Sequence, residues 1–129
     1  MAGVPLLAFI VAAYTALAWV APGWLEATQF SLPLLSGSAL LFQGGDVLLV
    51  IGLALLCVEI YRATNSSSAA IVNHVLSLVV FIIALIDLLV MPRMANMTFF
   101  LIVLMTLSDV IAGFTVTIST ARRDFQRGS

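Results

Sequence analysis

Four stretches of the chain are almost purely apolar, and more polar segments separate them. They cover residues 4–21, 46–63, 69–91 and 97–120. A helix needs roughly 20 apolar residues to cross about 30 Å of hydrocarbon, and each stretch comes close to that length. Helix is the structure expected for each, because a chain inside lipid must satisfy its own backbone hydrogen bonds. The pattern therefore predicts an all-α, polytopic membrane protein, built as a four-transmembrane-helix bundle.

The connections between the last three stretches are short. One is centred on Asn65 and Ser66, and the other covers residues 92–96. Helices joined so closely lie antiparallel as neighbours. We therefore expect one transmembrane domain over residues 1–129. The first stretch contains Ala16-Leu17-Ala18, which resembles a signal-peptide cleavage site, but it lacks a basic start. A retained membrane anchor is the better interpretation.

The long segment between the first two stretches carries one charge, Glu26, and an apolar piece over residues 32–42. Eleven residues are too few to span a bilayer. We predict a short interfacial helix over about residues 38–43, lying on the outer leaflet. The alternatives are a re-entrant dip and an extension of the second helix, kinked at Gly44-Gly45. Such an apolar loop would also suit docking against another subunit.

Arginine placement predicts the orientation. Arg93 lies at one end of the predicted bundle. The arginines at the opposite end are Arg62, Arg122, Arg123 and Arg127. The positive-inside rule then places both termini in the cytoplasm, with Glu26 outside. The expected location is the inner (plasma) membrane, crossed several times.

Composition supports the membrane assignment and excludes several classes of protein. The chain is 63% hydrophobic and 9% charged, with a mean hydropathy of +1.22, whereas a soluble domain carries about 25% charged residues. Lipid is therefore the expected partner. The net charge of −1 and the lack of a basic stripe argue against nucleic acid. A single cysteine and a single histidine cannot build a disulfide or a zinc site within one chain. We expect no cofactor and no metal, and we assign no catalytic residue.

Two aspartates lie inside the third and fourth apolar stretches. Asp109 is near the middle of the last stretch, where a carboxylate costs a few kcal/mol and therefore needs compensation. Asp87 lies about eight residues closer to the outer turn, or about 12 Å at helical rise, so the two cannot form a carboxylate pair. Arg93 is a plausible partner for Asp87. Of the two, Asp109 is the stronger candidate for a functional group.

A second pair of polar residues flanks the inner turn. Glu59 lies about seven residues before this turn and His74 about eight residues after it. The two residues are therefore expected at similar depth on adjacent helices. An interaction between them would offset the cost of burying both. In the alternative interpretation, Glu59 pairs with Arg62 one turn away and His74 faces the lipid headgroups. Both interpretations stay open.

Small and polar side chains form stripes on three of the predicted helices. In chain order these are Ala8, Ala12 and Ala16; Asn73, Ser77, Ala84 and Asp87; and Thr98, Ile102, Asp109, Gly113 and Thr120, flanked by Thr106 and Thr117. Such stripes let helices approach closely and hydrogen-bond to each other. They predict either the bundle interior or a subunit interface. Helix packing is favoured over a conduction pathway.

Three functions fit these features. The first is a membrane component without catalytic chemistry, acting as a homo-oligomer or as an accessory subunit of a larger membrane assembly. The second is a small channel or transporter for protons, ions or a solute, with Asp109 as its intramembrane site. The third, a membrane enzyme or quinone-binding subunit, has only the single histidine in its favour. We favour the first function.

Overall fold

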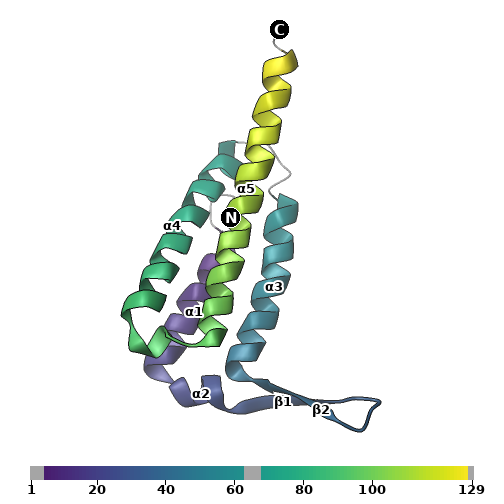
Figure 1. The fold of residues 1–129 in the computed structure, drawn as a ribbon, viewed down its shortest axis with the longest axis vertical. Coiled ribbons are helices and arrows are strands. Elements are labelled where there is room, and N and C mark those ends of the chain that lie inside the picture. The colour runs from purple at the N-terminus through teal and green to yellow at the C-terminus, as the bar shows by residue number, and fades with distance from the viewer. Residues whose placement is uncertain (1–4, 63–67, 128–129) are drawn as a thin grey trace.

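The chain folds into a bundle of long helices with a β-hairpin at one end (Figure 1). The computed structural model describes residues 5–62 and 68–127, without the side chains of residues 68–70, 116, 117 and 119–127. The long helices are α1 (Leu7–Val20), α3 (Gly44–Arg62), α4 (Ser68–Val90) and α5 (Met97–Arg127); the shorter elements are α2 (Pro22–Glu26), β1 (Thr28–Pro33), β2 (Ala39–Gln43) and the 3-10 helix η1 (Pro92–Met94).

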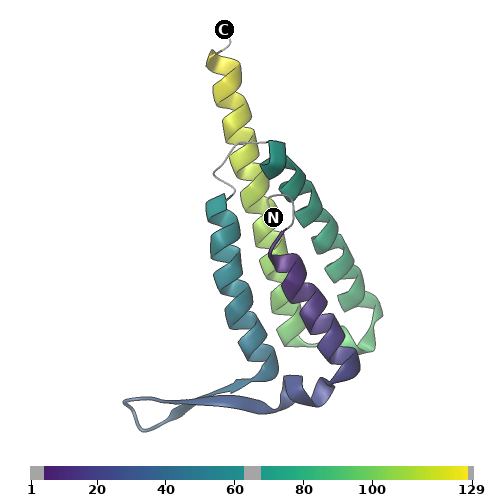
Figure 2. The ribbon, with the colours of Figure 1, turned by 180° about the vertical axis from the view of Figure 1, so that it is seen from behind.

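Helix α5 lies at the centre of the bundle. It packs between α3 and α4, and α1 covers the back of this layer (Figures 1 and 2). The far end of α5 extends beyond the other helices (Figure 1). The apex of the inner turn at Asn65 and Ser66 lies outside the described residues, as do the side chains of Arg122, Arg123 and Arg127.

Within the described residues, three helices are long and apolar enough to cross a membrane: Gly44–Arg62, Ile71–Val90 and Met97–Thr115. They match the second, third and fourth apolar stretches of the sequence. Helix α1 has only 14 residues, which is about 21 Å at 1.5 Å per residue. It therefore falls short of the hydrocarbon thickness that the prediction for residues 4–21 assumed.

The predicted interfacial helix over residues 38–43 is wrong, because this segment forms strand β2 and pairs antiparallel with β1. The amide of Gly37 donates to the carbonyl of Leu34, and Gly37 has a φ of 92°. A turn that ends in such a left-handed residue is a common hairpin connection. The helical extension is also absent, and the hairpin runs away from the bundle rather than back along it (Figure 1). Pairing with a strand about ten residues away decided this conformation.

The turn between α4 and α5 holds the end of α1. The Tyr14 hydroxyl donates to Asn96 Oδ1 at 2.9 Å, and the same oxygen accepts the Phe99 amide at 2.9 Å, near the start of α5. Arg93 Nη1 donates to the Ala18 carbonyl at 3.3 Å, and the guanidinium lies 4.5 Å from the centre of the Trp19 ring. These contacts join the short helix to the turn between α4 and α5.

Candidate functional site

Among the side chains that the structure describes, six polar or charged ones are buried between the helices: Glu59, Asn73, His74, Ser77, Thr106 and Asp109. They come from α3, α4 and α5, whose outward faces are largely Val, Leu, Ile and Phe. A buried polar group is costly unless it is hydrogen-bonded, and the cost is higher where lipid replaces water. The partners of these groups therefore decide whether the cluster stabilises the bundle or is poised for chemistry.

Glu59 links three helices. Its side chain is 1% exposed. One carboxylate oxygen accepts the backbone amide of Leu6, at the start of α1. The other oxygen accepts from Asn73 Nδ2 on α4 at 3.0 Å. Arg62 lies on the same helix as Glu59, with its Nη1 3.5 Å from the first oxygen.

The bond to Leu6 explains how a short helix can begin inside the bundle. The first amides of a helix have no acceptor within the helix, and such groups are costly away from water. The helix dipole also places partial positive charge at this end, which favours a carboxylate. Glu59 supplies both the acceptor and the negative charge. This role was missed by the sequence analysis, because α1 and Glu59 are 53 positions apart.

Asp109 is 4% exposed and faces α4. Its Oδ2 accepts from Ser77 Oγ at 3.0 Å. Ser77 Oγ also lies 2.9 Å from the carbonyl of Asn73, one turn earlier. A hydroxyl carries one hydrogen. It cannot donate fully to both oxygens at once, so both contacts are full hydrogen bonds only when Asp109 carries a proton and donates it to Ser77 Oγ, while Ser77 donates to the Asn73 carbonyl.

His74 packs against the backbone of α5 at Gly113. A Cβ atom added to Gly113 would lie 2.8 Å from His74 Cδ2, so the ring occupies the space that the glycine leaves. His74 is buried rather than turned to headgroups. On α4, Glu59 accepts from Asn73, the residue before His74. The alternative pairing of Glu59 with Arg62 is also present.

Asp87 lies apart from this cluster. It is partly exposed near the end of α4. The partner suggested for it, Arg93, contacts Ala18 and Trp19 instead, and no ion pair joins the two residues in the described part of the chain. The bent connection through η1 directs Arg93 toward α1.

The predicted packing residues divide into two groups. Gly113 and Thr106 are buried, and Thr106 Oγ1 donates to the carbonyl of Val103 at 2.6 Å. The ridge on α1 behaves differently, because Ala12 and Ala16 are exposed and Ala8 is only partly buried. The face of α1 that packs inside the bundle is instead Leu7, Ile10, Val11, Tyr14 and Ala18. Of the two roles predicted for the ridge, the bundle interior is therefore excluded.

Neither buried carboxylate lies on the cavity at the end of the bundle that carries the hairpin. This cavity has a volume of about 640 Å³, and its lining includes Tyr14, Glu26 and Arg93. Within residues 5–62 and 68–127, no three histidine, cysteine, aspartate or glutamate side chains gather as a metal site would require. The arrangement can hold helices together and can hold a proton between Asp109 and Ser77.

Comparison with known protein families, characterised proteins and solved structures finds no match to this chain.

Proposed function

We propose that the chain is a small integral protein of the inner membrane that acts as a homo-oligomer or as an accessory subunit of a larger membrane assembly, without catalytic chemistry of its own. In this proposal α3, α4 and α5 cross the bilayer, and α1 packs beside them as the fourth helix. The arginines of the inner end lie in the cytoplasm with both termini.

The observation that carries this proposal is the use of the buried polar groups as links between helices. Glu59 connects α1, α3 and α4, and Asp109 connects α5 to α4. Interhelical hydrogen bonds of this kind stabilise membrane bundles. The exposed surface adds further support, because the alanine ridge on α1 suits close approach of another helix.

The first test is purification in mild detergent, with identification of whatever co-migrates. A homo-oligomer is expected to migrate as a defined multiple of the 13.8 kDa chain. An accessory subunit is expected to bring a larger membrane protein with it. A chain that migrates only as a monomer without a partner would contradict the proposal.

For a homo-oligomer, we expect Ala12→Leu to weaken association several-fold, because the larger side chain keeps the neighbouring helix from approaching closely. Energy transfer between labelled chains in liposomes measures this association. Ala54→Leu is the matched control, since Ala54 is also exposed but lies on α3, away from the ridge. An equal response of the two variants would exclude the ridge as the interface.

The alternative function is translocation of a proton, an ion or a solute through Asp109. The observation in its favour is the single hydroxyl hydrogen of Ser77 between two acceptors, which makes the hydrogen bonding depend on a proton at Asp109. Intramembrane carboxylates are a recognised feature of proton pathways.

Asp109→Asn separates the two functions. The introduced amide can still hydrogen-bond to Ser77, so the structural role is expected to survive. We expect liposomes with the wild-type chain or with this variant to show the same proton permeability, measured with an internal pH-sensitive dye, and the same oligomer. A proton flux that the wild-type chain carries and the variant loses would establish the alternative instead.

A further inference from the structure

The hairpin of β1 and β2 has one fully apolar face. Phe30 pairs with Phe42 across the two strands, and Leu32 pairs with Leu40. Residues that pair directly, and residues two apart along a strand, share a face of the sheet. These four side chains therefore form one surface, on which the two phenyl rings lie 5.4 Å apart. We call it the apolar hairpin face. The opposite face carries Ser31, Pro33, Ala39 and Leu41.

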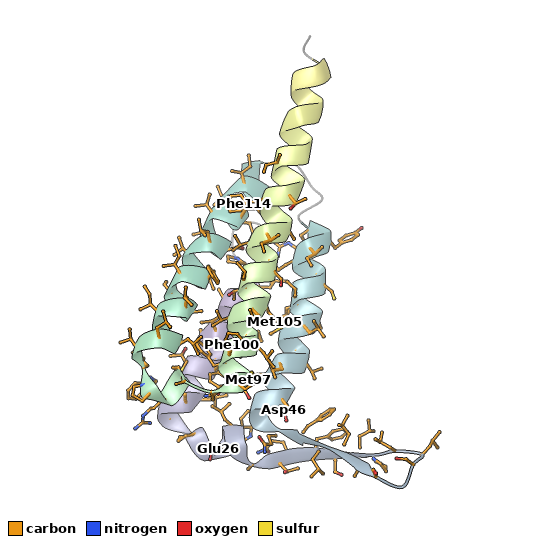
Figure 3. The ribbon with its side chains drawn as sticks, viewed as in Figure 1. Glu26, Asp46, Met97, Phe100, Met105 and Phe114 are labelled. Atoms are coloured by element: carbon orange, nitrogen blue, oxygen red, sulfur yellow. The ribbon has the colours of Figure 1, made fainter. Side chains whose placement is uncertain are left out.

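No part of the bundle covers this hairpin. All residues of β1 are exposed, and on β2 only Phe42 is partly buried. The charges that flank the hairpin in sequence are Glu26 and Asp46, and no charged residue lies between them. Both lie at the end of the bundle from which the hairpin projects (Figure 3). An isolated two-stranded hairpin is only marginally stable in water, so an uncharged hairpin of this kind needs an apolar environment.

The position of the hairpin indicates which environment this is. Strand β2 ends at Gln43, and α3, which is long and apolar enough to cross a membrane, begins at Gly44. The hairpin runs across the helix axes rather than along them (Figures 1 and 2). If α3 crosses the bilayer, the hairpin therefore lies along the membrane plane at the level of the headgroups.

The backbone limits how deep the hairpin can lie. A two-stranded sheet has two free edges, whose unpaired N–H and C=O groups need water. Such edges are not found within the hydrocarbon. A hairpin lying flat meets both requirements, with its edges among the headgroups and one apolar face turned toward the acyl chains.

We propose that the apolar hairpin face binds the lipid surface, inserting Phe30, Leu32, Leu40 and Phe42 into the outer leaflet beside the bundle. This proposal rests on the membrane placement of α3, α4 and α5 given above. The hairpin then extends the contact between this small protein and the membrane well beyond the helices.

Spin labels at neighbouring positions on opposite faces test the proposal. Cys57 is the only cysteine, so labels are attached in a Cys57→Ala background after Leu40→Cys or Leu41→Cys. These leucines are 46% and 58% exposed. In vesicles of phosphatidylcholine and phosphatidylglycerol, oxygen reports contact with lipid and a water-soluble nickel chelate reports contact with water. The ratio of oxygen to nickel accessibility is expected to be several-fold higher at position 40 than at position 41. Leu32→Cys and Ser31→Cys should repeat this difference on β1.

Each other outcome overturns the proposal in a distinct way. Equal and high nickel accessibility at both positions would place the hairpin in water. Low accessibility to both reagents would mean that another protein covers it, and spin–spin broadening would identify a second copy. A label at Val79, on the exposed surface of α4, is the control for the membrane placement. Low oxygen accessibility at Val79 would reject the membrane placement itself. High oxygen accessibility at Val79, together with high nickel accessibility at the hairpin positions, would reject the hairpin proposal alone.

Discussion

Glu59→Ala is expected to destabilise the bundle strongly. The change leaves the Leu6 amide and the Asn73 side-chain amide without their acceptor, and it removes the charge next to Arg62. Removal of one partner from a buried charged network typically costs about 3–5 kcal/mol. The free energy of unfolding in detergent should fall by about this amount. Tryptophan fluorescence can follow the transition, since Trp19 is close to the contacts that hold α1.

Glu59→Gln is the matched control for this prediction. The introduced amide oxygen can still accept from Leu6. Asn73 Oδ1 is buried without a hydrogen-bond partner among the described residues, so rotation of the Asn73 amide would let it accept from the introduced NH₂ group. A clearly smaller loss than that of Glu59→Ala is therefore expected. Equal losses would show that the negative charge at the start of α1, rather than the hydrogen bonds, holds this region together.

Gly113→Ala is expected to destabilise the contact between α4 and α5. The added methyl group would lie 2.8 Å from His74 Cδ2 and 2.9 Å from His74 Cγ. These atoms belong to a rigid ring in a buried site, so the ring or the helix must move. Overpacking of this kind typically costs about 1–3 kcal/mol, which outweighs the gain of up to about 1 kcal/mol in helix propensity. Thermal unfolding in detergent measures the difference.

Two variants control for this effect. Gly52→Ala also adds a methyl group within a helix, but its nearest neighbour is Met105 Cε at 2.8 Å, the end of a flexible side chain. Its cost should be smaller. Combining Gly113→Ala with His74→Ala removes the ring that causes the clash, so the two changes together should cost less than the sum of their separate effects. Strict additivity would mean that the ring and the glycine do not compete for space.

The sequence alone was enough to locate the long helices. The apolar stretches at 46–63 and 69–91 agree with α3 and α4 to within two residues, and α5 begins at Met97 as predicted. Length and hydropathy are local properties, and in lipid they leave helix as the only structure for a long apolar stretch. Counting residues from the turn after Arg62 predicted that Glu59 and His74 lie at similar depth, and in the structure Glu59 accepts from Asn73, the residue before His74.

The hairpin could not be predicted from its own residues. Residues 39–43 have no alternation of apolar and polar positions that would distinguish a strand from a short helix. Their conformation depends on pairing with β1 across the turn at Gly37. The same limit applies to Arg93. Asp87 on α4 was the predicted partner, but Arg93 donates to Ala18 on α1 instead.

Thus the sequence by itself determined that the chain is helical and apolar enough to cross a membrane, because these properties follow from the order of residues along each stretch. Only the tertiary structure decided that α1 begins beside Glu59, that Ser77 lies between Asn73 and Asp109, and that the alanine ridge faces outward. These features depend on how each helix is rotated against its neighbours. The rotation of each helix depends on pairing the buried polar groups and packing the side chains closely across all the helices together. No single stretch of sequence specifies it.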